Sequence, residues 1–151
     1  KQGQAKMSKS DPDSAIFMED SVEDVARKLQ NAYCPSESSG GSPATGDEES
    51  MSLVEDELKN PCLDYIRYVL FSQEGYIFKV AATGQSFSSF QEVKDAFVSG
   101  ALSEALLKES LTLEVNSLLE PVRRHFAEDS VAKELLAKVT QWRRETLTPT
   151  S

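Results

Sequence analysis

The stretch that decides the fold is SEALLKESLTLEVNSLLEPVRRHF, residues 103–126. Its apolar side chains recur every three or four positions, which is the period of an amphipathic helix. They are Leu106, Leu107, Leu111, Val115, Leu118, Leu119, Val122 and Phe126. Ser103 can cap the start of this helix. Pro121 interrupts the pattern, but the periodicity continues beyond it, so we expect a kink rather than a break.

The first two helices expected along the chain are both capped. Ser21 opens an apolar-periodic pattern, with Asp24 three positions later, and the pattern should stop before Pro35. Asn60 can cap a second helix, in which Pro61 takes the first helical position. The apolar stripe expected on this second helix consists of Leu63, Tyr65, Ile66, Val69 and Leu70.

A β-hairpin is expected between the second helix and the long one. Residues 76–80 are rich in β-branched and aromatic side chains, the Thr83-Gly84 pair can turn the chain, and residues 85–87 can return. Ser89 and Glu92 then form a capping box that opens a short helix.

The last expected helix starts at Asp129 or Ser130. Its apolar stripe, predicted to face inward, consists of Val131, Leu135, Val139 and Trp142. The fold class expected from all these patterns is mainly α, a small helical bundle of about five helices with one short β-hairpin.

Composition narrows the class of protein. The chain has 151 residues, of which 27% are charged and 39% hydrophobic, enough for one compact domain or a small domain with appendages. It contains no run of apolar residues long enough to span a membrane and no secretory leader pattern at Lys1–Ser10. Cys34 and Cys62 lack metal-ligand spacing and cannot form a disulfide framework, which favours a reducing compartment with reduced thiols.

An acidic, Ser- and Gly-rich segment accounts for most of the negative charge. The net charge is −9, but without the residues between Tyr33 and Asn60 the chain has 18 acids against 15 bases. The negative net charge argues against a protein that coats nucleic acid non-specifically. Acids and bases are nearly balanced in the rest of the chain, which allows a local contact with phosphate. Residues 36–58 are predicted to be a disordered insertion, and a simple tether is favoured over a phosphorylated segment.

The pentapeptide Lys6-Met7-Ser8-Lys9-Ser10 carries the chemistry. Two lysines and two hydroxyls on a polar loop suit a polyphosphate, because ammonium groups are compact charges and hydroxyls and amides donate to phosphate oxygens. Composition alone would favour a solvated basic loop.

This pentapeptide is identical to the KMSKS signature of class I aminoacyl-tRNA synthetases. The residues that follow it, from Ser10 to Asp20, resemble the tyrosyl and tryptophanyl subclass. Further segments resemble the archaeal and eukaryotic tyrosyl branch: Ala32–Pro35, Asn60–Ile66, Leu118–Arg123 and His125-Phe126. The likeness covers nearly the whole chain outside the insertion, and it indicates the C-terminal portion of a tyrosyl-tRNA synthetase.

The resemblance implies an ATP-dependent tyrosine–tRNA ligase, with ATP, L-tyrosine and tRNA(Tyr) as partners and Mg²⁺ accompanying ATP. It implies that Lys6 and Lys9 are catalytic and stabilise the pyrophosphate that leaves during tyrosyl-adenylate formation. Ser8 and Ser10 would hold the loop or donate to phosphate, and the Met7 backbone would face adenine. No protein metal site is implied, and the fragment alone is expected to be inactive.

The anticodon side departs from the family pattern. Leu106 stands where the family has an Asp that reads the first anticodon base, and the family's aromatic residue falls near Ala81. An aliphatic side chain cannot accept hydrogen bonds from a base, so we expect anticodon reading to be degraded. The alternative is that this segment is wrongly aligned with the family pattern. The signature is complete while anticodon reading is expected to be degraded. This combination suggests that the chain belongs to a dimer or to the catalytic half of a tandem pseudo-dimer.

The expected domains are residues 1–35, the signature loop and connecting helix at the end of a catalytic domain; 36–58, the insertion; 59–147, a helical domain of the anticodon-binding type; and 148–151, a tail. The expected location is cytoplasmic, with no membrane.

Two other interpretations remain open: a non-catalytic helical module for protein interaction or tRNA binding, and a tryptophanyl-tRNA synthetase relative. Arg123, Arg124, Arg143 and Arg144 could contact RNA phosphates, although charge at helix ends is preferred.

Overall fold

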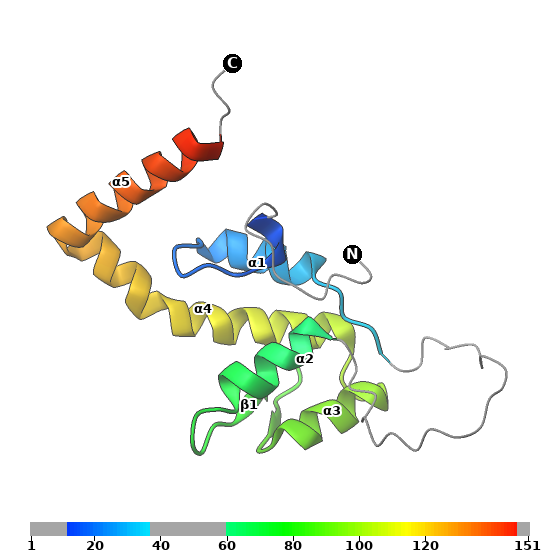
Figure 1. The fold of residues 1–151 in the computed structure, drawn as a ribbon. Helices are drawn as coiled ribbons and strands as arrows, with labels where there is room; N and C mark the ends of the chain where they lie inside the picture. The colour runs from blue at the N-terminus through cyan, green and yellow to red at the C-terminus, as the bar shows by residue number, and fades with distance from the viewer. Residues whose placement is uncertain (1–11, 37–59, 148–151) are drawn as a thin grey trace, which may run out of the picture.

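The computed structural model describes residues 12–36 and 60–147, and these residues are mostly helical (Figure 1). A 3-10 turn, η1 (Pro12–Ser14), precedes α1 (Val22–Asn31), α2 (Pro61–Tyr65) and η2 (Ile66–Leu70). The strands β1 (Phe78–Val80) and β2 (Gln85–Phe87) lead into α3 (Phe90–Val98), α4 (Glu104–Glu128) and α5 (Ser130–Leu147). The predicted fold class, five α-helices with one short hairpin, is confirmed.

The predicted helix caps are confirmed by hydrogen bonds. Ser21 and Ser103 each accept a bond from the backbone amide three residues later. The Asn60 side chain accepts from two backbone amides of α2, and Ser89 forms a complete capping box with Glu92. Each cap satisfies donors that a helix leaves open and is worth about 1 kcal/mol, which explains why these helices begin where the sequence places them.

The long helix α4 continues through Pro121, as its periodicity predicts. Figure 1 shows the orange end of α4 turning away from the line of its yellow half. A proline within a helix lacks an amide hydrogen and crowds the preceding turn, so a bend without a break is the expected result.

The second helix is not a regular α-helix throughout. Beyond Tyr65 it becomes the π-helical turn η2, in which the amide of Phe71 donates to the carbonyl of Ile66 at 3.0 Å. Ile66 and Leu70 are fully buried, but Val69, which the sequence pattern placed on the inner face, is 39% exposed. A π turn holds more residues than an α turn, so the α-helical spacing misplaces Val69.

The hairpin is antiparallel, and Phe78 pairs with Phe87 across it. Its first strand is shorter than predicted, because it begins at Phe78 and leaves Ile77 46% exposed ahead of it. The turn ends at Gly84, whose positive φ of 72° suits a residue without a Cβ.

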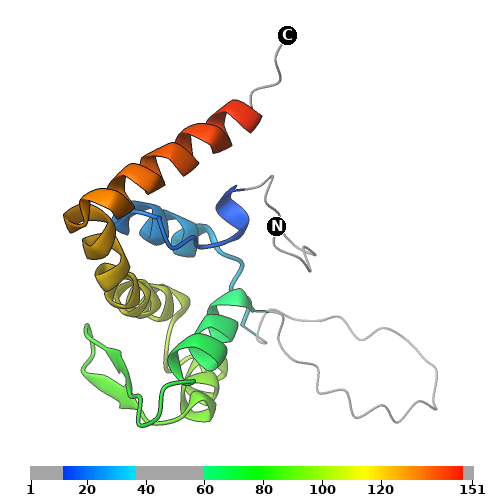
Figure 2. The same ribbon diagram turned by 60° about the vertical axis from the view of Figure 1, so that its left-hand side comes forward.

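The helix α4 is the centre of the molecule. The helix α1 lies on one side of it, while α2, α3 and the hairpin lie on the other (Figure 2). The core is formed by buried apolar side chains from each of these elements, including Val25, Leu29, Ile66, Phe78, Val93, Leu107, Leu111 and Val115.

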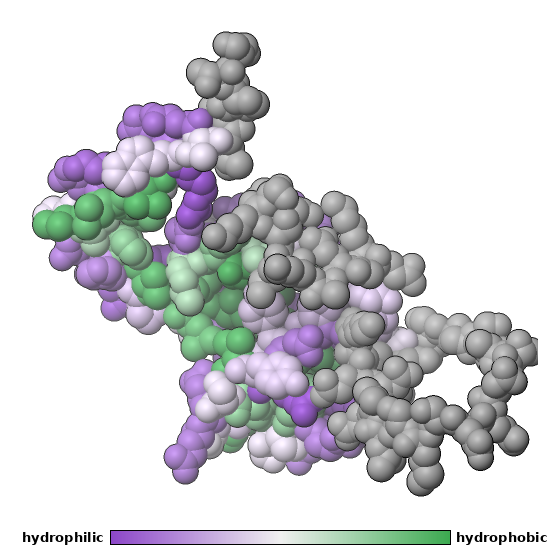
Figure 3. Space-filling view, viewed as in Figure 1, coloured by the Kyte–Doolittle hydropathy of each residue, from purple (hydrophilic) through white to green (hydrophobic). Residues whose placement is uncertain are grey.

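The prediction that the apolar stripe of α5 faces inward is wrong. Val131, Leu135, Val139 and Trp142 are 45–65% exposed, and Ala132 is the one α5 residue buried among those described. The helix meets the end of α4 and projects from the body (Figures 1 and 2), and apolar surface gathers where the two helices meet (Figure 3). Periodicity identifies an apolar face of a helix, but it does not determine what packs against that face.

Most of the predicted insertion, residues 37–58, and the tail at 148–151 lie outside the described residues. Among the described helices, none combines the length and apolar character needed to cross a bilayer.

Candidate functional site

The predicted catalytic and ATP-binding residues, Lys6, Met7, Ser8, Lys9 and Ser10, lie outside the described residues. The structure instead shows the segment that directly follows them, residues 12–20, which we call the anchor segment. Side chains from four helices contact it, and their contacts define how the signature is attached to the helical domain.

The centre of the anchor is a buried ion pair. The Lys28 ammonium lies 2.6 Å from an Asp20 carboxylate oxygen, and the two side chains are 6% and 10% exposed. The same ammonium donates to the carbonyl of Ala15 at 3.0 Å and lies 4.6 Å from the centre of the Phe17 ring. The Asp20 carboxylate also accepts from the amide of Phe17 at 2.8 Å. Both charges therefore have the multiple partners that burial requires.

The helix α4 holds the anchor through Arg123. Its Nε donates to the carbonyl of Asp20 at 2.9 Å, and its terminal nitrogens donate to the side chain and carbonyl of Asn116. The Arg123 side chain is 17% exposed. A guanidinium engaged in this way orients the loop that follows the signature and is poorly placed to meet an RNA phosphate.

The helices α2 and α5 also contact the anchor. The Tyr65 hydroxyl hydrogen-bonds to the backbone of Ile16, and burial raises the pKa of this phenol. Arg143 forms an ion pair with Glu19. Burial opposes ionisation of Glu19, but the hydrogen bond and charge of Arg143 outweigh it and lower the pKa of the carboxyl below its ordinary value.

An exposed ion pair completes these contacts. Arg27, on α1, lies 2.8 Å from Asp13 and also pairs with Asp24 on its own helix. Because all three side chains are about half exposed, solvent screens these pairs and each contributes little to stability.

The two positions predicted to correspond to the family's anticodon-reading residues lie in different elements. Leu106 lies in the first turn of α4, half-buried against the core, and Ala81 lies in the exposed turn of the hairpin. Neither side chain can donate or accept a hydrogen bond, so neither can read a base edge.

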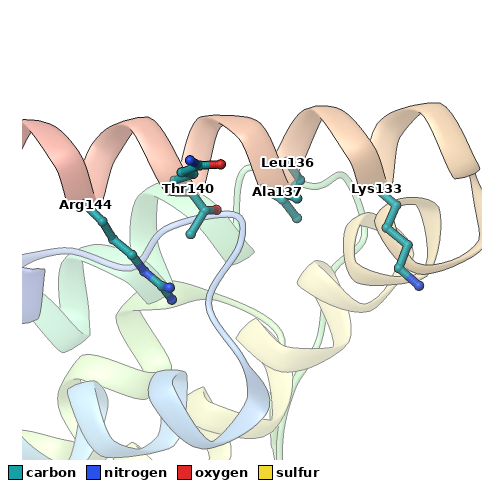
Figure 4. Close-up of a pocket in the computed structure, with 6 residues that line it drawn as sticks. Lys133, Leu136, Ala137, Thr140 and Arg144 are labelled. Atoms are coloured by element: carbon teal, nitrogen blue, oxygen red, sulfur yellow. The ribbon is translucent and has the colours of Figure 1, made fainter.

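The structure also contains an open hollow of about 580 Å³ along α5. It is lined by Lys133, Leu136, Ala137, Thr140, Gln141 and Arg144, several of which project from the same side of the helix (Figure 4). None of these residues belongs to the anchor contacts described above. Within residues 12–36 and 60–147, no group of three His, Cys, Asp or Glu side chains could hold a metal ion.

Comparison with known proteins identifies the family. Residues 1–120 match the family model described as tRNA synthetases class I (W and Y). The chain belongs to this family. The predicted resemblance is therefore confirmed, and the matched range includes the signature pentapeptide, the anchor segment and most of α4.

The relatives and solved structures are tyrosyl enzymes. The chain is 38% identical over 146 residues to the cytoplasmic tyrosine–tRNA ligase 2 of Arabidopsis thaliana, covering 94% of this chain and 17% of that protein. It is 32% identical to the tyrosine–tRNA ligase of Pyrococcus horikoshii, covering 90% of this chain and 33% of the relative. The Leishmania major tyrosyl-tRNA synthetase in complex with tyrosinol superposes with a TM-score of 0.77 at 46% identity, over 95% of this chain and 26% of that one.

The chain spans about a third or less of the length of these tyrosine–tRNA ligases. Family membership therefore rests on a shared part, namely the signature and the helical domain.

Sequence reasoning found the signature but missed the anchor contacts. Lys28 gave a usable indication, because it lies on the same helical face as the buried Val25 and Leu29. A lysine on an apolar face needs a buried partner. The sequence did not show that Asp20, eight residues earlier, would be that partner.

Proposed function

We propose that the chain is part of an ATP-dependent tyrosine–tRNA ligase and that its signature loop stabilises the leaving pyrophosphate. The observation that carries the proposal is the KMSKS pentapeptide within a chain whose residues 1–120 match the class I family. Support also comes from the anchor segment, because side chains from four helices hold the chain immediately after the signature.

The proposed reaction has two steps. The carboxylate of tyrosine attacks the α-phosphate of ATP, the α–β phosphoanhydride bond breaks, and tyrosyl-adenylate and pyrophosphate form. A hydroxyl at the 3′ end of tRNA(Tyr) then takes the tyrosyl group and AMP leaves. Charge builds on the pyrophosphate in the first step, so cations that meet it more closely in the transition state speed that step. Mg²⁺ would accompany ATP.

In this proposal, Lys6 and Lys9 supply those cations. Ser8 and Ser10 donate to phosphate or hold the loop, and the backbone of Met7 faces the adenine. The anchor segment, which follows the signature in the sequence, is held by the contacts described above.

The test is ATP–pyrophosphate exchange by the full-length protein. Lys9→Ala should slow exchange roughly a hundredfold, since a lost electrostatic contact of this kind costs about 3 kcal/mol. Lys1→Ala, which removes the same charge outside the signature, is the matched control and should leave the rate unchanged. Equal rates for wild type and Lys9→Ala would refute the proposed role.

We also propose the domain division given above, with residues 59–147 as a helical domain whose anticodon reading is degraded. The aliphatic side chains at Leu106 and Ala81 support this. In the full-length protein, Leu106→Ala should then leave the dependence of aminoacylation on the first anticodon base of tRNA(Tyr) unchanged. A loss of that dependence in the variant would show that this domain reads the base.

Assembly and location form the last part of the proposal. A dimer or tandem pseudo-dimer would allow the catalytic half and the anticodon-reading half to be different copies of the domain. Light scattering of the full-length protein measures its mass in solution, and a mass of one unduplicated subunit would contradict this. The cytoplasm is the proposed location, as in the names of the two Arabidopsis relatives.

A further inference from the structure

The two cysteines of the chain lie in contact in the core, although 27 residues separate them in the sequence. Cys34 follows the end of α1, and Cys62 lies in the first turn of α2. Asn60 bonds to both residues, and each thiol affects the pKa of the other. Neither cysteine has a role in the proposed ligase reaction, so the contact calls for its own explanation.

Asn60 fixes the two cysteines relative to each other. Its amide nitrogen donates to the Cys34 sulfur at 3.3 Å, and its carbonyl oxygen accepts from the backbone amide of Cys62 at 3.0 Å. Asn60 itself is fully buried, so the bridge is a permanent part of the core. The two cysteine residues are therefore held near each other by a buried contact of the fold.

The two thiols differ in access and in acidity. Cys34 is 6% exposed and Cys62 is 0% exposed, so a small reagent from solvent meets Cys34 first. The hydrogen bond from Cys62 lowers the pKa of Cys34, burial opposes this effect, and the Asn60 amide lowers it further. The same contact and burial raise the pKa of Cys62. This arrangement favours a thiolate on Cys34 with a protonated thiol beside it.

We propose that Cys34 and Cys62 are a reversible oxidation site that hydrogen peroxide converts to an intramolecular disulfide. The Cys34 thiolate attacks one peroxide oxygen, the O–O bond breaks, and Cys34 becomes a sulfenic acid while hydroxide leaves and is protonated to water. The Cys62 sulfur then attacks the Cys34 sulfur, the S–O bond breaks, and the second water leaves. The two thiols are oxidised by two electrons in total, and the peroxide is reduced to two waters.

The disulfide would link Cys34 and Cys62, on the two sides of residues 37–59, and a dithiol reductant would reverse it. Cross-linking across a loop of this length restricts the unfolded chain, so the oxidised protein should melt at a higher temperature than the reduced protein. The function of the site would be to make the junction between α1 and α2 sensitive to peroxide.

The test is a peptide map of the full-length protein after treatment with hydrogen peroxide. Trypsin separates the two cysteines, because the chain has no Lys or Arg between Lys28 and Lys59 and is cut again after Arg67. Remaining thiols are first blocked under denaturing conditions. We expect peptides 29–59 and 60–67 to be recovered joined, two hydrogens lighter than their sum, and to separate again after dithiothreitol.

Two variants assign the order of attack. In Cys62→Ser the sulfenic acid at Cys34 has no neighbouring thiol, and dimedone should label it. In Cys34→Ser the fully buried Cys62 should remain a free thiol. The peptide map of the wild-type protein tests the proposal even if a variant fails to fold.

Three results would overturn the proposal. One is recovery of peptides 29–59 and 60–67 as separate peptides, each with its thiol blocked, after treatment with enough peroxide to oxidise glutathione fully. Another is overoxidation of Cys34 without a link to Cys62. The third is a link between two chains on a non-reducing gel in place of a link within one chain.

Discussion

The buried ion pair of the anchor allows a quantitative test. Asp20→Ala removes the carboxylate that accepts from Lys28 at 2.6 Å and from the amide of Phe17 at 2.8 Å. Because both side chains of the pair are at most 10% exposed, water cannot replace the lost partner. Breaking a buried pair in this way costs about 3–5 kcal/mol. Lys28 keeps its bond to Ala15, which places the expected loss near the lower limit, at about 3 kcal/mol.

The measurement is native-state hydrogen exchange of the α1 amides in the full-length protein. A loss of about 3 kcal/mol in the free energy of local opening corresponds to roughly a hundredfold faster exchange. Arg27→Gln is the matched control on the same helix. It breaks only half-exposed pairs, so the exchange rate should change by about twofold at most.

A double variant separates the loss of the pair from the burial of an unpaired charge. Replacing Lys28 by Met in the Asp20→Ala protein removes the orphaned ammonium and keeps an apolar side chain in its place. The double variant should therefore exchange more slowly than Asp20→Ala alone. The reasoning would be refuted if Asp20→Ala exchanged no faster than Arg27→Gln, or if adding Lys28→Met accelerated exchange further.

Other residues give further predictions. Asn60→Ala removes the α2 cap and the bonds to Cys34 and Pro35, and urea unfolding should show a loss of about 2–3 kcal/mol. Ser89→Ala removes only an exposed capping box, so the same assay should show about 1 kcal/mol. Because the pKa of Glu19 is lowered in the folded protein, its contribution is present above the ordinary value of 4.5 and is lost as pH falls through the lower folded value. The difference in Tm between wild type and Glu19→Gln should therefore be present at neutral pH and vanish in acid. Trp142→Ser should lower Tm little, because that side chain is 61% exposed; a large loss would show that α5 packs more tightly than described.

The elements that sequence predicted well are those fixed by neighbours in the chain. The caps at Ser21, Asn60, Ser89 and Ser103 each depend on groups within three residues, so local chemistry was sufficient. The passage of α4 through Pro121 was predictable because the apolar period on both sides outweighs one missing hydrogen bond.

The elements that sequence misjudged depend on tertiary contacts. The stripe on α5 has helical spacing, but its side chains remain 45–65% exposed in the described part of the chain. Val69 turned outward because η2 is wider than an α-helix, and periodicity assumes regular α-helical geometry. Ile77 had strand-forming character but lies ahead of the first ladder pair.

The candidate site was predictable only in part for the same reason. The signature is a contiguous motif that can be recognised in the sequence, whereas its anchor joins residues up to 124 positions apart. Arg123 illustrates the difference. The sequence suggested a phosphate contact, but the structure gives its guanidinium protein partners that include Asp20 and Asn116.

The bond from the Asn60 amide to the carbonyl of Pro35, at 3.1 Å, has a practical consequence for engineering. It joins described residues on the two sides of the acidic segment, so the two ends of that segment lie close together. The entropic cost of closing a loop grows only slowly with its length. A fluorescent reporter or a protease site could therefore be spliced in between Ser36 and Asn60, or that stretch shortened to a few glycines, while the helices on either side keep their places.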